Sequence, residues 1–156
     1  MKVFISYGDA GDQVTALRLQ ALGSVNGLIV YVPPAFTRRE STSDLDPETA
    51  VKLREADVVL GIVGDHLTEA CRLELEAGFE SQKSMIVMAF ESLAQRLERF
   101  TGSSLVLIDP EDAGSAEAGV VRLLKALNAP QASKKALLAL STLALGLMML
   151  TPVHQD

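Results

Sequence analysis

Short apolar runs alternate along most of the chain with segments in which apolar residues recur at helical spacing. The runs are rich in Val, Ile and Leu, and they predict five strands, at residues 3–7, 28–32, 57–63, 85–89 and 105–108. Helices are predicted between these strands, at residues 12–22, from residue 47 onward, and at 68–81, 92–100 and 115–127. In the first of these helices the periodic residues are Val14, Leu17, Ala21 and Leu22.

Strands that alternate with helices predict an α/β domain whose parallel sheet is covered by helices on both faces. With five strands the expected architecture is flavodoxin-like, with strand order 2-1-3-4-5, over residues 1–130. In such a sheet, ligands bind at the carboxyl ends of the strands, at the point where the strand order reverses. The sequence therefore predicts a site between the first and third strands, lined by residues 6–11 and by residues 64–68.

The C-terminal region, residues 131–156, differs in composition from the rest of the chain. Residues 136–153 carry no charge, and as a helix they would extend for about 27 Å. That length is close to the ~30 Å hydrocarbon core of a bilayer. We therefore expect a hydrophobic C-terminal helix that anchors the domain at the inner face of the plasma membrane, with Lys134 and Lys135 on the cytoplasmic side. The alternative is a helix that is buried in an oligomer.

The overall composition narrows the classes of function. The chain has 156 residues, a net charge of −6 and a pI near 4.9. An acidic surface repels phosphate backbones, and aromatic residues make up only 4% of the chain, so nucleic acid is not an expected partner. Cys71 is the single cysteine and there are two histidines, which excludes an internal disulfide and argues against a transition-metal enzyme.

Glu74, in the helix after the third strand, is the strongest candidate for chemistry. Its neighbours one helical turn away are all small and uncharged: Ala70, Cys71, Ala77 and Gly78. We expect the carboxylate to sit in a shallow depression with no cation within one turn. Glu76 differs, because it follows Arg72 by four residues and is expected to form a solvated ion pair.

Two loops near the expected site also carry polar residues. Residues 6–12 contain glycines but match neither the dinucleotide-binding loop nor the P-loop, so neither of those standard sites is expected. The loop after the second strand contains Arg38 and Arg39 together with hydroxyl residues. Paired arginines of this kind bind phosphates or the acidic face of a partner.

Three segments resemble Toll/interleukin-1 receptor (TIR) domains. K-V-F-I-S-Y, at residues 2–7, is similar to the first box of that family, and residues 46–63 are similar to its second helix and third strand. A-C-R-L-E-L-E-A, at residues 70–77, resembles the motif that carries the catalytic glutamate of TIR-type NAD⁺ hydrolases. In that motif a Cys precedes the glutamate by three positions, which selects Glu74. The resemblance extends over about residues 2–127.

The resemblance implies a NAD⁺ nucleosidase that cleaves the nicotinamide–ribose bond of NAD⁺, which is its substrate, and that needs no cofactor. Nicotinamide leaves as a neutral base, so one carboxylate suffices, and Glu74 would stabilise the positive charge that develops on the ribose. The product is ADP-ribose or a cyclised form. The chain departs from the family at Ala70, where an aromatic residue is common. The substrate-binding residues that we expect are Ser6, Tyr7, Gly8, Asp9, Arg38, Arg39 and Cys71.

The resemblance also implies a cytoplasmic domain that forms homo-oligomers through TIR contacts and is activated by that assembly, with a role in antiphage defence or cell-death signalling. Three alternatives stay open. One is a non-enzymatic adaptor that recruits other TIR domains through residues 33–46. Another is a membrane effector, in which residues 136–153 are the lesion and the TIR part is the sensor. The third is a relationship to nucleoside deoxyribosyltransferases, which have a similar sheet, a comparable glutamate and also N-glycosidic chemistry.

Overall fold

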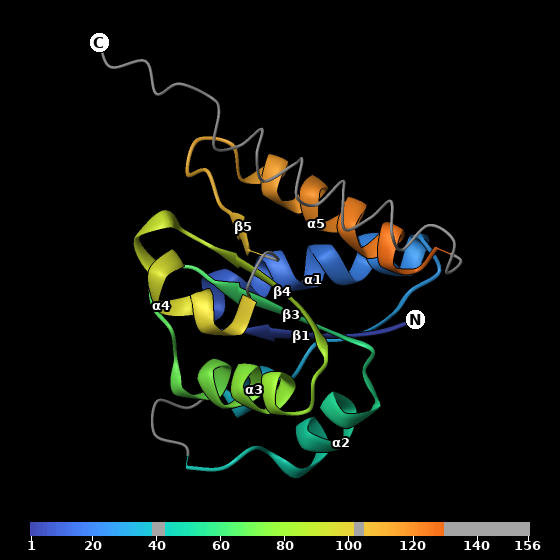
Figure 1. The fold of residues 1–156 in the computed structure, drawn as a ribbon, viewed down its shortest axis with the longest axis vertical. Helices are drawn as coiled ribbons and strands as arrows, with labels where there is room; N and C mark the ends of the chain where they lie inside the picture. Colours follow the sequence, from blue (N-terminus) through green and yellow to red (C-terminus); the bar gives the residue numbers. More distant parts are fainter. Residues whose placement is uncertain (39–42, 102–104, 130–156) are drawn as a thin grey trace.

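Five parallel strands form one central sheet, in the order β2-β1-β3-β4-β5. The computed structural model describes residues 1–38, 43–101 and 105–129. Within them the strands are β1 (Lys2–Tyr7), β2 (Ile29–Tyr31), β3 (Val58–Val63), β4 (Ser84–Ala89) and β5 (Leu105–Leu107). This is the flavodoxin-like strand order predicted from the sequence. Figure 1 shows β1, β3, β4 and β5 in this order.

Helices cover both faces of the sheet (Figure 1). One face carries α1 (Ala10–Val25) and α5 (Ala113–Leu127), and the other carries α2 (Pro47–Glu55), α3 (Glu69–Glu80) and α4 (Glu91–Thr101). A single 3₁₀ turn, η1 (Ala35–Thr37), follows β2. The helix predicted at residues 68–81 is α3, and its position directly after β3 brings it to the point where the strand order reverses.

Alternate side chains of β1 enter two separate cores. Val3 and Ile5 pack with α1 and α5, whereas Phe4 packs with residues of α2, α3 and α4. Ser6 follows the same alternation as Phe4 and therefore points toward α3. The period of two in the strand thus places one polar side chain, at the carboxyl end of β1, against the helix that carries Glu74.

The predicted first helix is present in the structure. The face that it buries, however, is not the one formed by the periodic apolar residues of the sequence. α1 begins at Ala10, because the Asp9 side chain accepts hydrogen bonds from the first backbone N–H groups. Its buried face consists of Asp12, Ala16, Leu19 and Gly23. Gly23 allows close packing, since a Cβ at that position would lie 2.7 Å from Val30 Cγ2. Val14, Leu17 and Leu22, which define the helical spacing in the sequence, are exposed.

The hydrophobic C-terminal helix predicted over residues 131–156 lies outside the described residues, and so does the expected membrane segment 136–153. Among the helices that the structure describes, none combines the length and the apolar composition that a membrane span requires. The described helices are those that cover the sheet.

Candidate functional site

Glu74 lies on the inner side of α3, next to the carboxyl ends of β1 and β3, and only 2% of the residue is exposed. α3 approaches the sheet closely because of Gly78, at which a Cβ would lie 3.0 Å from Val59 Cγ2. The expectation of a shallow depression is therefore wrong. The small neighbours of Glu74 allow the helix to pack tightly, and this packing removes the carboxylate from water.

Ser6 and Cys71 contact each other and Glu74 beneath the end of β1. Ser6 Oγ donates a hydrogen bond of 2.5 Å to Glu74 Oε2, and Cys71 Sγ lies 3.2 Å from the same hydroxyl oxygen. Burial raises the pKa of Cys71 to about 12, and the nearby Glu74 carboxylate adds to the increase. Cys71 is therefore a neutral thiol near neutral pH, which argues against a thiolate nucleophile at this site.

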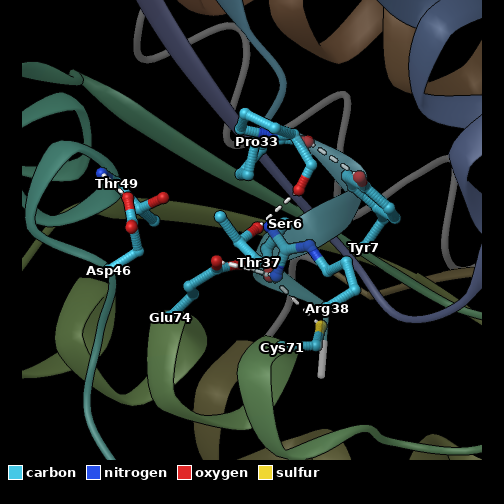
Figure 2. A network of polar contacts seen from close by, with 10 residues as sticks. Ser6, Tyr7, Pro33, Thr37, Arg38, Asp46, Thr49, Cys71 and Glu74 are labelled. Atoms are coloured by element: carbon cyan, nitrogen blue, oxygen red, sulfur yellow. Dashed lines mark hydrogen bonds and ion pairs between the residues drawn. The ribbon is translucent and has the colours of Figure 1, made fainter. Parts of the chain in front are cut away.

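Arg38 supplies the cation that the sequence neighbours of Glu74 lack. Its Nη1 lies 2.7 Å from Glu74 Oε1, and its guanidinium carbon lies 4.4 Å from the centroid of the Tyr7 ring. Figure 2 shows the guanidinium between these two residues. The Arg38 side chain is 5% exposed, and none of its guanidinium nitrogens has a hydrogen-bond partner of regular geometry among the described residues. Arg38 therefore pairs with Glu74 by charge and keeps buried N–H groups that are able to bind further oxygen atoms.

One hydrogen bond joins the chain segment that carries Arg38 to the end of β1, and a second lies within the segment. The Tyr7 hydroxyl donates to the Pro33 carbonyl oxygen, and the Thr37 hydroxyl donates to the Pro34 carbonyl oxygen, both at 2.7 Å (Figure 2). The first bond fixes the start of the segment that follows β2, and the second stabilises the 3₁₀ turn before Arg38. Arg38 reaches Glu74 because of this local fold, although the two residues belong to different elements.

Burial raises the pKa of Glu74 above its ordinary value, while the Arg38 charge and the Ser6 hydrogen bond oppose the increase. The site thus combines a desolvated carboxylate with a buried guanidinium. Such a pair can bind a ligand that carries both a positive and a negative group, because each ligand charge meets a protein charge of opposite sign.

Asp9 and Gly8 have roles other than contact with Glu74. The Asp9 carboxylate caps α1, with Oδ1 accepting from Gly11 N at 2.9 Å and from Asp12 N at 3.1 Å. Gly8 makes room for Asp12, since a Cβ at Gly8 would lie 2.9 Å from Asp12 Oδ2. Asp12 Oδ2 in turn accepts a hydrogen bond of 3.2 Å from Gly64 N, and this bond joins the start of α1 to the turn after β3.

We expect the Asp12→Asn variant to be more stable than the parent protein at pH 7. Burial raises the pKa of Asp12, and the hydrogen bond from Gly64 only partly opposes the increase. A raised native pKa means that the stability contributed by Asp12 is present below the unfolded-state pKa and is lost as the pH rises through the native pKa. Asn keeps an oxygen acceptor for Gly64 but never carries the charge.

Urea unfolding of both proteins between pH 4 and pH 7 measures this effect. The advantage of the Asn variant in free energy of unfolding should grow with pH over this range. An advantage that is constant with pH, or that grows toward acid, would contradict the assignment of a buried charge at Asp12.

The structure brings together five of the predicted site residues: Ser6, Tyr7, Arg38, Cys71 and Glu74. Arg39 lies outside the described residues. Among the residues that are described, no group of His, Cys, Asp and Glu side chains could hold a metal ion. Asp12 was not predicted. Its position four residues before Ala16 and seven before Leu19, on one side of the helix, is the signal that could have identified it.

Comparisons with known proteins show the fold alone. No protein-family model and no curated protein matches the chain. Among solved structures, the sugar isomerase domain of the RpiR transcription factor from Sphaerobacter thermophilus is similar over 88% of this chain and 76% of its own, with a TM-score of 0.58 and 12% identity. A 2-deoxyribosyltransferase from Bacillus psychrosaccharolyticus is similar over 57% of this chain and 72% of its own, with a TM-score of 0.43 and 15% identity. The resemblance to TIR domains stays a prediction from the sequence.

Proposed function

We propose that the chain hydrolyses the N-glycosidic bond of a nucleotide, with Glu74 as the carboxylate that stabilises the transition state, and that NAD⁺ is the substrate. The observation that carries this proposal is the placement of Glu74, a desolvated carboxylate at the point where the strand order reverses, next to the buried Arg38 guanidinium. The choice of NAD⁺ comes from the resemblance of residues 70–77 to the motif of TIR-type NAD⁺ hydrolases.

The reaction suits a site with one carboxylate. The bond from the ribose C1′ to the nicotinamide nitrogen breaks, and its electron pair goes to the pyridinium ring, which leaves as neutral nicotinamide. The positive charge then lies on the ribose, where Glu74 stabilises it through electrostatics and hydrogen bonds to the ribose hydroxyls. A water molecule adds to C1′ and loses a proton, which yields ADP-ribose. No acid is needed for the leaving group, unlike in ordinary glycosidases, which use two carboxylates.

The charges of NAD⁺ match those of the site. Its nicotinamide riboside half is cationic and would face Glu74, whereas its pyrophosphate is anionic and would face Arg38. In the free protein these two side chains pair with each other at 2.7 Å. When NAD⁺ binds, Glu74 would pair with its cationic half and Arg38 with its pyrophosphate. Neither buried charge would then be left without a partner.

Substrate can reach Glu74 only after Arg38 moves. Glu74 is 2% exposed and the Arg38 side chain 5%, so the free protein holds the site closed. A closed site agrees with the activation by assembly that the TIR resemblance implies, because assembly can supply the free energy that opens it.

The direct test is nicotinamide release from NAD⁺ by the full-length protein on liposomes at high protein density. Release without any added acceptor supports the hydrolase. Exchange of bases between 2′-deoxynucleosides, with no NAD⁺ turnover, would instead favour the chemistry of deoxyribosyltransferases. No turnover of either substrate would favour the non-enzymatic adaptor.

We predict that Arg38→Ala raises the KM for NAD⁺ by roughly tenfold to a hundredfold, the range expected when charge-assisted hydrogen bonds to a phosphate are lost. Nicotinamide riboside has the same scissile bond but no pyrophosphate, so its KM should not rise, and it should fall if the loss of Arg38 uncovers Glu74. Steady-state kinetics with both substrates measure the difference. Arg122→Ala is the matched control, because Arg122 is exposed on α5, on the other face of the sheet. An equal loss with both substrates would contradict a role of Arg38 in binding phosphate.

A further inference from the structure

The outer face of α1 is apolar, although it is exposed in the described structure. This face consists of Val14, Leu17, Ala21, Leu22 and Val25. Its four large residues are 56%, 48%, 42% and 86% exposed, in chain order. They recur at intervals of three, five and three residues and so lie along one side of the helix. A contiguous row of large apolar side chains is typical of an interaction surface.

The opposite side of α1 faces the sheet and is mostly apolar apart from Asp12. Ala16, Leu19 and Gly23 are buried against the sheet. Polar residues separate the two faces: Gln13, Gln20 and Ser24 lie along one side of α1 and Thr15 along the other. The outer side does carry one charged residue, Arg18, which pairs at 2.5 Å with Glu117 of the neighbouring α5. Because this pair directs Arg18 toward α5, the apolar row on the other side of Arg18 is still continuous.

We propose that residues 136–153 of the same chain pack on the outer face of α1. α1 and α5 both run back along the sheet from the carboxyl ends of their strands, so both helices end at the same edge of the sheet (Figure 1). Residues 128–135, which lead on from α5, can span at most about 28 Å. That is enough to cross the width of one helix, about 10 Å. The uncharged segment 136–153 would be about 27 Å long as a helix, and α1, with 16 residues, is about 24 Å long.

Two features favour residues 136–153 on α1 over a second copy of the chain or a lipid surface: the short connection to α5 and the placement of charges. A segment tied to α5 by a short connection has an effective concentration in the millimolar range, well above that of a separate molecule. Lys134 and Lys135 would lie near the carboxyl end of α1, whose last turn contains no basic residue. Cations are favourable at that end of a helix. The segment also contains Thr142 and Gly146, whose small side chains allow two helices to approach closely.

Cysteine labelling in the full chain tests the proposal. The native Cys71 is fully buried, so a maleimide reports on an introduced cysteine. A Leu17→Cys protein should react about tenfold more slowly than the same protein with Leu140→Asp and Leu147→Asp, because the acidic residues would release the segment from α1. Val51→Cys is the control, since Val51 is 40% exposed on α2, on the other face of the sheet, and should react equally with and without the acidic residues.

The other possible results would show that something else covers the outer face of α1, or that nothing does. Equal labelling of Leu17→Cys with and without the acidic residues would overturn the proposal. If labelling of Leu17→Cys slows as the protein concentration is raised about a hundredfold, and light scattering gives the mass of a dimer, a second copy of the chain covers α1 instead. If Leu17→Cys is labelled slowly only when phosphatidylcholine vesicles are present, and the protein floats with the vesicles, the chain is anchored in a membrane. Hydrogen exchange of the unmodified chain gives a second measurement, in which α1 and residues 136–153 should be protected together in the absence of lipid.

Discussion

Nicotinamide release from NAD⁺ is expected to fall by about a thousandfold when Glu74 is replaced by Gln, which is the size of loss seen when one preorganised electrostatic group is removed from a transition state. Gln has the shape of Glu, and its amide oxygen can still accept the hydrogen bond from Ser6. It carries no negative charge, however, so it cannot stabilise the cationic ribose. The loss should appear in kcat more than in KM, because the ribose charge develops only in the transition state.

Glu76→Gln is the matched control for this experiment. Glu76 lies on the same helix, is more exposed than Glu74, and forms an ion pair with Arg72 at 2.7 Å. This pair was predicted from the spacing of the two residues. The Glu76 variant should keep the activity of the parent, and circular dichroism should show that both variants fold. Equal activity of the Glu74 variant and the parent would contradict the proposed reaction, and equal loss in both glutamate variants would point to helix stability rather than chemistry.

Gly61→Ala should both destabilise the protein and lower its activity. A Cβ at Gly61 would lie 2.8 Å from Leu75 Cδ2 and 3.3 Å from Val87 Cγ2. Both neighbours are fully buried, so either side chain can give way only by displacing other core side chains. Overpacking of this kind costs about 2 kcal/mol in free energy of unfolding, which corresponds to a decrease in Tm of roughly 4–8 °C for a chain of this size.

The activity should fall with Gly61→Ala because Leu75 is the residue after Glu74. When Leu75 moves outward, α3 moves away from the sheet, and the 2.5 Å hydrogen bond between Ser6 and Glu74 lengthens. Gly119→Ala is the control, since a Cβ there would be 3.9 Å from its nearest neighbour, Val106 Cγ1. Ala also favours the helix over Gly by about 1 kcal/mol, so the control should be as stable as the parent or more so. Thermal unfolding and kinetics of both variants check the prediction, and a Gly61 variant with normal stability and activity would contradict it.

Much of the fold followed from local patterns in the sequence. Five apolar runs and the helical spacings between them were sufficient to predict the strand order, because short parallel strands with helical connections allow few arrangements. The helix boundaries differ by one or two residues at several ends. At α1 the cause is a cap, since the Asp9 side chain satisfies the first backbone N–H groups and starts the helix at Ala10.

The candidate site was predicted in part. The strand order places the ends of β1 and β3 together, so Ser6 and Glu74 were expected to be close, and they are hydrogen-bonded although 68 residues separate them. Arg38 was expected near the site, but its direct pairing with Glu74 was not. That contact depends on η1, which was not predicted, and on the hydrogen bond from Tyr7 to Pro33.

The sequence by itself determined the order and type of the elements, and it predicted both the edge of the sheet at which a site would lie and Glu74 as the candidate carboxylate. Each of these follows from residues within a few positions of one another, where periodicity and helix geometry are set. Only the tertiary structure decided which side of α1 is buried, that Arg38 closes over Glu74, and that Asp12 binds Gly64 across 52 residues. These outcomes depend on how closely two elements pack, and that distance is set by side chains that are far apart in the chain.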